Sequence, residues 1–119
     1  MNTWAQRHRD ALEAALDDGE ELVAAERVIA PGRRRRRPRD FPRGGFVFVV
    51  TNRRYIALEA SRWLARPGPV IASWPFEAGY ALGAGSPWTS GRVHLVLPDR
   101  SVVTLAPYGG RSLGHLLAR

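Results

Sequence analysis

The chain has 119 residues, a length that suits one domain with its own hydrophobic core. It contains no cysteine, which excludes a disulfide framework and thiolate metal sites. The longest uninterrupted apolar run, residues 46–50, is far shorter than the ~20 residues that span a bilayer, and the N-terminus lacks an apolar signal-peptide core. We therefore expect a cytoplasmic protein that can bind peripherally at a membrane.

The charge is unevenly distributed along the chain. The formal net charge is +7, with −5 over residues 1–26, +10 over residues 27–66 and +2 over residues 67–119. All 18 basic residues are arginines, which the codon bias of a GC-rich genome could explain, but codon bias does not explain why Arg33 to Arg37 and Arg39 form one block. Blocks of like charge repel, stay solvated and often serve as interaction segments.

The first 30 residues predict a helix followed by a strand. Thr3 and Gln6 have capping-box spacing, and an apolar stripe then recurs at helical intervals until Gly19, which predicts a helix over 3–18. We expect its acids to form a solvated outer face, with an acidic patch facing a partner or the chain's own arginines as the alternative. Residues 21–30 are richer in extended-chain formers and predict a strand.

The rest of the chain predicts short strands. Residues 31–45 form a polar, arginine-rich connection that we expect to be disordered, and 46–51 with 55–59 predict a hairpin in which Asn52 tolerates a left-handed turn. Pro and Gly at 67–69 break the chain before strands at 70–74 and 80–83. A second hairpin is predicted at 92–97 and 102–106, and a short helix at 110–118. Such a pattern favours a mainly β sandwich or partly open barrel of about seven antiparallel strands, in one domain over 1–119 with the barrel at 20–106 and a capping helix.

Three stretches of the sequence indicate a family resemblance: residues 19–23, read GEELV, residues 48–56, read FVVTNRRYI, and the 92–106 hairpin with the helix after it. They resemble the short bacterial PH-like domains, which are related to PH and GRAM modules and include the YokE-like type. The chain departs from the family at Arg100, where a turn glycine is common, and in its shorter final helix. The resemblance implies a PH superfold, two roughly orthogonal antiparallel sheets capped by a C-terminal helix.

In PH domains that bind phosphoinositides, basic residues on the first inter-strand loop and its flanking strands hold the phosphates. The resemblance therefore implies an anion-binding set, with the last two members carried over less securely: Arg27, Arg33, Arg34, Arg35, Arg36, Arg37, Arg39, Arg43, Arg53 and Arg54. The expected partner is an anionic lipid headgroup or an acidic protein surface. A sequence-tolerant nucleic-acid binder remains an alternative, although no docking motif for nucleic acid is present.

The sequence gives little support to catalysis. His8, His94 and His115 are scattered without metal-ligand spacing, and no Gly-x-Ser-x-Gly motif occurs. We expect no catalytic residue, metal or cofactor. The prediction is a non-catalytic PH-like binding or adaptor module, with a structural subunit of a larger assembly as the alternative.

Overall fold

Runs of β-branched and aromatic residues form the strands of an antiparallel sheet, because such side chains pack well on a pleated, buried surface. The computed structural model describes residues 3–30, 44–60, 66–75, 80–84, 93–96 and 102–107. Its elements are α1 (Thr3–Arg7), α2 (Arg9–Glu13), β1 (Leu22–Ala30), β2 (Gly44–Thr51), β3 (Arg54–Ala60), β4 (Pro67–Pro75), β5 (Tyr80–Ala84), β6 (Val93–Val96) and β7 (Val102–Pro107). The strands follow the order β4-β3-β2-β1-β7-β6-β5, and paired neighbours are antiparallel.

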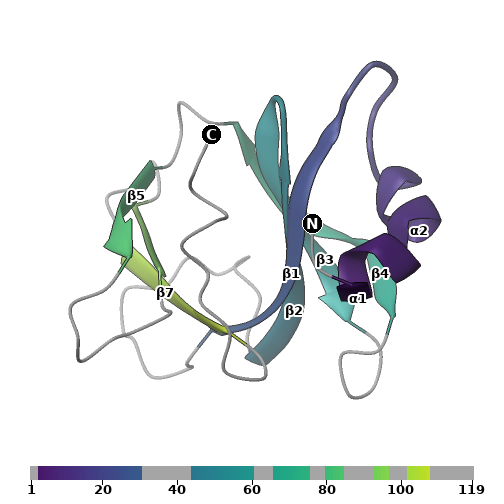
Figure 1. Ribbon diagram of the computed structural model, residues 1–119. Coiled ribbons are helices and arrows are strands. Elements are labelled where there is room, and N and C mark those ends of the chain that lie inside the picture. The colour runs from purple at the N-terminus through teal and green to yellow at the C-terminus, as the bar shows by residue number, and fades with distance from the viewer. Residues whose placement is uncertain are drawn as a thin grey trace.

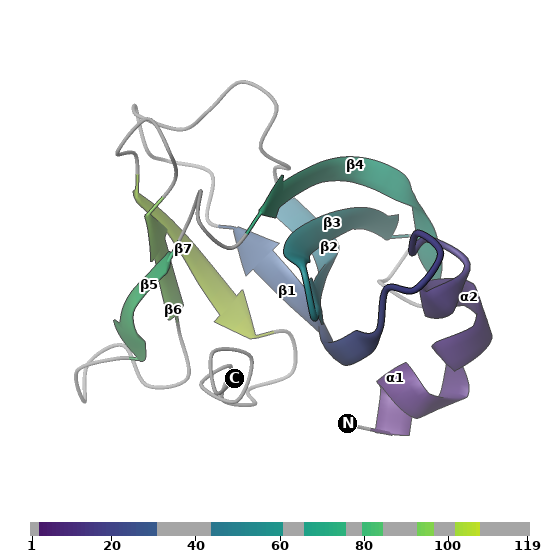
Figure 2. The same ribbon diagram turned by 90° about the horizontal axis from the view of Figure 1, so that it is seen from above.

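The strands β4, β3, β2, β1 and β7 form a curled half-barrel, whose curvature is clearest in β3 and β4 when the molecule is seen from above (Figure 2). The two helices lie on one side of β1, and β5 and β7 lie on the other (Figure 1). The mainly β, antiparallel fold is thus confirmed, and the curled sheet is compatible with a PH-like architecture. The predicted C-terminal capping helix over 110–118 lies outside the described residues.

The first predicted hairpin is confirmed, and the strands of the second pair with each other, while their connection, residues 97–101, lies outside the described residues. Strands β2 and β3 pair from Phe46 with Glu59 to Val50 with Tyr55, and a two-residue connection, Asn52 and Arg53, joins them. Strands β6 and β7 pair from Val93 with Leu105 to Val96 with Val102. Both were predicted from short β-branched or aromatic runs.

Two predicted breaks are strand instead. Gly44 and Gly45 were assigned to the connection, but they belong to β2 and pair with Ala30 and Ile29, so the connection spans only residues 31–43. Residues 67–69 were read as a break and are part of β4. β4 is the last strand in the order at its end of the sheet, where proline is tolerated because no further ladder needs its missing N–H.

The single helix predicted over 3–18 is also corrected, because the structure has two five-residue helices. The break falls at His8, whose φ of −106° and ψ of 18° lie outside the helical range. Regular helix ends at Glu13, and the next turn tightens, with the N–H groups of Ala15 and Leu16 donating to carbonyls three residues back. Gly19 then adopts a φ of +78°, a left-handed conformation that glycine enters without strain.

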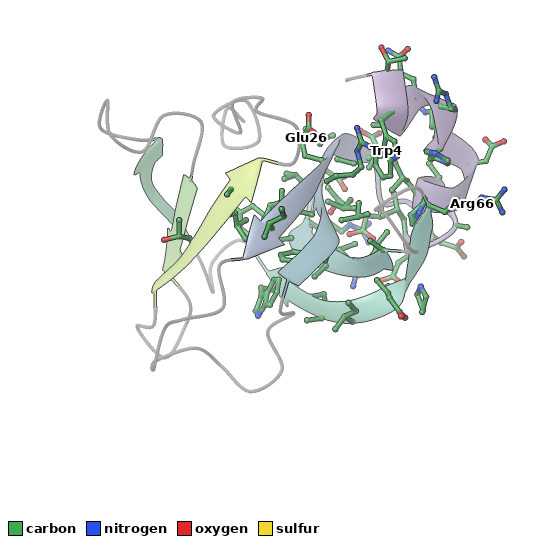
Figure 3. All side chains as sticks on the ribbon, turned by 90° about the horizontal axis from the view of Figure 1, so that it is seen from below. Trp4, Glu26 and Arg66 are labelled. Carbon is green, nitrogen blue, oxygen red and sulfur yellow. The ribbon has the colours of Figure 1, made fainter. Side chains whose placement is uncertain are left out.

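The central residues of strands β1, β2 and β3 are buried on both faces of the sheet. One face packs against the helices, where Trp4, Ala5 and Leu12 join a core cluster completed by sheet residues Ala25, Val47, Val49, Ile56 and Leu58. The opposite face buries a second set that includes Val28, Phe46, Phe48 and Tyr55. Helix α1 contacts β1 and α2 contacts β4, and Figure 3 shows Trp4 between α1 and the sheet.

Candidate functional site

The predicted anion-binding residues belong to three places along β1: the ends of the 31–43 segment at one end, Arg27 within the strand, and Arg53 and Arg54 at the other end. At one end Ala30 pairs with Gly44, so both ends of the 31–43 segment are fixed on adjacent strands. At the other end Leu22 pairs with Thr51, beside the turn that carries Arg53 and the first residue of β3, Arg54. The nine residues of β1 extend over about 25 Å at the usual rise of a strand. The β2–β3 turn and the described ends of the 31–43 segment are therefore about 25 Å apart along β1.

Seven of the ten predicted arginines, those at 33–37, 39 and 43, lie outside the described residues. With Asp40 they give the 31–43 segment a net charge of +6. The fold contributes the position of the segment's two ends, at the β1–β2 end of the sheet. The other three predicted arginines, Arg27, Arg53 and Arg54, are described.

Arg54 binds an anion within its own chain, the carboxylate of Glu20. Its Nε donates to Glu20 Oε2 at 2.9 Å and its Nη2 to Glu20 Oε1 at 3.0 Å, a two-pronged geometry that suits guanidinium and carboxylate. The Glu20 side chain is fully buried and that of Arg54 is 22% exposed. Arg54 Nη2 also lies 3.5 Å from the exposed carboxylate of Asp17. Arg54 is therefore a structural partner of Glu20 and not part of an exposed anion site.

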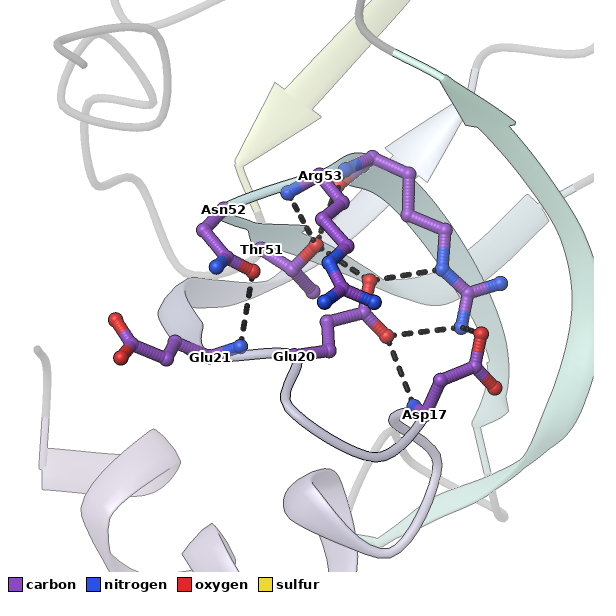
Figure 4. Close-up of polar contacts among 7 residues, drawn as sticks. Asp17, Glu20, Glu21, Thr51, Asn52 and Arg53 are labelled. Carbon is purple, nitrogen blue, oxygen red and sulfur yellow. Dashed lines mark hydrogen bonds and ion pairs between the residues drawn. The ribbon is translucent and has the colours of Figure 1, made fainter.

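The Glu20–Arg54 cluster extends into the β2–β3 turn and the chain before β1 (Figure 4). Thr51 Oγ1 accepts from the backbone N–H groups of Arg53 and Arg54 and donates to Glu20 Oε2 at 2.7 Å, the shortest contact open to its single proton. Glu20 Oε1 also accepts from the backbone N–H of Asp17 at 3.0 Å. The buried carboxylate thereby receives four hydrogen bonds, which offset much of the cost of burying its charge.

Asn52 joins the same two segments through backbone groups. Its Oδ1 accepts from the N–H of Glu21 at 2.9 Å, and its own N–H donates to the carbonyl of Glu21 at 3.1 Å. From the sequence, Asn52 was predicted only to tolerate the left-handed backbone conformation of the turn. In the structure its side chain fastens the β2–β3 turn to the start of β1.

These contacts change the acidity of Glu20. The hydrogen bonds from Arg54, followed by those from the Asp17 N–H and the Thr51 hydroxyl, hold the pKa of Glu20 at about 2, although burial acts in the opposite direction. The same pair raises the pKa of Arg54. Both groups are charged at any physiological pH.

Arg27 is held on the helix side of the sheet. Its guanidinium carbon lies 5.2 Å from the centre of the Trp4 ring, within the range of a cation–π contact. The Trp4 ring also lies close to His8, whose ring centre is 5.0 Å from that of Trp4. Arg27 thus packs under α1, while Arg53 stays exposed at the turn.

Sequence reasoning missed Glu20 as the partner of Arg54, whereas Asp17 is one of the acids for which contact with the chain's own arginines was the stated alternative. The available signal was that GEELV contains two acids and TNRR contains two arginines. Glu20 and Arg54 are 34 residues apart in the sequence, so no local pattern predicts that they form a pair.

The described part of the chain offers no metal-binding group of three or more His, Asp or Glu side chains. No helix within it has the length and apolar character needed to cross a membrane. A scan of protein-family models finds no match to the chain, and a search of curated protein sequences finds none either. The resemblance to PH-like domains therefore depends on the quoted motifs and on the curled antiparallel sheet.

Proposed function

We propose that this chain is a non-catalytic, PH-like binding module that engages an anionic lipid surface through the arginines of residues 31–43. The observation that carries the proposal is the pairing of Ala30 with Gly44, which fixes both ends of the segment at one end of the sheet. The segment that carries the seven arginines therefore leaves β1 and enters its neighbour β2 at the same end of the sheet. Arginine suits this role because its planar, weakly hydrated guanidinium binds phosphate with two hydrogen bonds.

The described arginines narrow the proposed site. Arg54 is occupied by Glu20, Arg27 lies on Trp4, and the turn that carries Arg53 is at the far end of β1. We therefore restrict the proposed anion-binding set to Arg33, Arg34, Arg35, Arg36, Arg37, Arg39 and Arg43. Binding at this end would leave the Glu20–Arg54 cluster intact.

The test is co-sedimentation with vesicles of phosphatidylcholine that contain roughly one quarter phosphatidylserine, with pure phosphatidylcholine vesicles as the reference. Replacing Arg33 to Arg37 by serine should abolish most binding, because each basic residue near an anionic surface contributes about 1 kcal/mol. Five such residues correspond to up to ~5 kcal/mol, or more than a thousandfold in affinity.

A matched pair of single variants separates position from total charge. Arg36→Ser and Arg53→Ser each remove one arginine, but only Arg36→Ser should weaken binding, by roughly fivefold. Equal losses would mean that net charge and not the 31–43 segment drives binding. Equal affinity for duplex DNA and for the vesicles would indicate an unspecific polyanion binder. The proposal fails if the unmodified protein does not bind anionic vesicles at low salt, and the structural-subunit alternative would then take its place.

A further inference from the structure

The sheet face beneath the helices is a regular apolar surface with one cation at its border. Cross-strand pairing places Leu58, Val47 and Arg27 side by side in one row. The next row on the same face contains Ile56, Val49 and Ala25. The five apolar members are at most 1% exposed, so the helices and the residues that follow them shield this surface from water.

The helices that cover this face have little stability of their own. Each is five residues long, well below the length at which an isolated helix persists in water. Trp4, Ala5 and Leu12 are the buried helix residues in the cluster, and Ala15 and Leu16 pack against it partly buried. The cover is therefore held by these few side chains and by its connection to β1.

The connection is fixed where it meets the sheet. The carboxylate of Glu20 accepts hydrogen bonds from the backbone N–H of Asp17, the residue after Leu16, and from the guanidinium of Arg54 in β3. The carboxylate of Asp17 reaches the same guanidinium, and the hydrogen bonds of Asn52 hold Glu21. Figure 4 shows these contacts meeting at the point where the chain leaves the helices and enters β1.

The sheet does not depend on the cover for all of its core. Val28, Phe46, Phe48 and Tyr55 are buried on the face opposite the helices, and the rings of Phe48 and Tyr55 lie 5.5 Å apart. The hydrogen bonds of the β1–β2 and β2–β3 ladders run between strands and do not involve the helices. Loss of the cover would leave this second face and these ladders in place.

We propose that α1 and α2 form a detachable cover over the β1–β2–β3 face, and that the Glu20–Arg54 cluster is the clasp that keeps it closed. The cover opens by local unfolding while the sheet stays folded, and opening uncovers the two apolar rows together with Arg27. The inference does not depend on the proposed lipid binding, because the Glu20–Arg54 cluster lies at the opposite end of β1 and the test measures hydrogen exchange alone.

Native-state hydrogen exchange of the full chain tests the inference in the unmodified protein and in Arg54→Gln. The helix reporters are the amides of His8, Leu12 and Ala14, which donate within the cover. The sheet reporters are the strand amides at 46–48 and 57–59, at the end of the hairpin remote from Arg54. In Arg54→Gln the helix amides should exchange about tenfold faster or more, with little change at the sheet amides.

Two further variants complete the design. Arg9→Gln breaks the exposed pair between Arg9 and Glu13 within α2 and should leave both sets of amides unchanged. Leu12→Ala loosens the cover from the helix side with the clasp intact, so it should reproduce the selective acceleration even if Arg54→Gln does not fold. The inference is overturned if helix and sheet amides accelerate by the same factor, or if neither set changes in Arg54→Gln.

Discussion

Glu20 is a buried charge whose oxygen atoms are supplied with donors from three different segments of the chain. Burying an unpaired carboxylate costs several kcal/mol, and a partner offsets this only with good geometry and further hydrogen bonds. Arg54 meets that requirement through two donors from one planar group, and Thr51 and the Asp17 N–H add one each. Lysine at position 54 could not reproduce the pair, because an ammonium lacks the rigid fork.

The pKa of Glu20 predicts a pH dependence of stability. A carboxylate whose folded-state pKa is lowered from 4.5 to about 2 stabilises the protein fully above pH 4.5 and loses this contribution as the pH falls toward 2. The shift corresponds to roughly 3 kcal/mol. Urea unfolding from neutral pH down to pH ~2 should show this loss in the unmodified protein, whereas Glu20→Gln should start less stable and lack the step.

The neighbouring acid provides the control for this titration. Glu21 is exposed, and Figure 4 shows its carboxylate pointing away from the cluster, so Glu21→Gln should keep the acid-dependent loss. A Glu20→Gln variant that still lost the full 3 kcal/mol would show that other carboxylates cause the acid sensitivity.

At the scale of elements, local patterns predicted the strands better than the helix. The β2–β3 hairpin follows from β-branched and aromatic runs on either side of a short polar turn, and its position is nearly as predicted. The predicted apolar stripe is confirmed in part: Trp4 and Leu12 are buried in one cluster and Ala15 and Leu16 pack against it, whereas Ala11 is exposed. Continuity of the helix was not predictable, because the break at His8 preserves the stripe while interrupting the regular backbone.

The candidate site was less predictable than the fold. Sequence reasoning assigned Arg27 and Arg54 to an external anion, and the structure gives them Trp4 and Glu20 as partners. Trp4 and Glu20 are distant in sequence from Arg27 and Arg54. Only the folding of the chain before β1 onto the sheet brings each pair together. Arginine clustering in a sequence therefore overstates the size of an anion site when some arginines serve packing.

Strand β4 carries the features of a guarded edge. It is terminal in the strand order, and its pairing with β3 shifts register twice, between the partners of Ala57 and Leu58 and between those of Leu58 and Ala60. Pro67 and Pro69 remove backbone donors, although Val70 and Ile71 are 46% and 43% exposed. Bulges and prolines of this kind prevent edge-to-edge association of exposed apolar strands.

Removing part of this protection should increase aggregation. Pro69→Val adds a backbone donor and a β-branched side chain beside two exposed apolar residues, so the rate of turbidity increase on heating should rise severalfold. Adding Ile71→Lys to the same variant should restore slow aggregation, because a charged edge residue opposes pairing. If Pro69→Val aggregates no faster than the unmodified protein, the edge is protected by something other than its prolines.

At the scale of the whole molecule, the charge asymmetry of the sequence becomes a separation in space. The residues before β1 carry acids such as Asp17, Asp18 and Glu21, whereas the arginine segment begins and ends at the other end of β1. The intervening distance of about 25 Å exceeds two Debye lengths at ~0.1 M salt. Over this distance salt screens the interaction between these acids and the two strand ends to which residues 31–43 are joined.

Trypsin provides a map of local stability along the chain, because it cleaves after arginines and these are distributed over most of the sequence. Arg27 lies in β1, which is paired on one side with β2 and on the other with β7, and Arg54 lies in β3 and is bound to Glu20. These two sites should resist cleavage in the folded protein, since a bond must leave its ladder before a protease can bind it. The charged composition of residues 31–43 predicts that the first cut falls between Arg33 and Arg39.

The two fragments produced by that first cut should remain associated. After a cut between β1 and β2, the β1–β2 ladder and the Glu20–Arg54 ion pair still join the two fragments. The fragments should therefore co-elute at the size of the intact protein. Mass spectrometry of early time points identifies the cleaved bond, and size-exclusion chromatography reports whether the fragments stay together. Initial cleavage at Arg27 or Arg54 would show that these strands open more readily than the arginine segment is cut. Separation of the fragments after a cut at 33–39 would show that the connection itself, and not the strand pairing, holds β1 to the sheet.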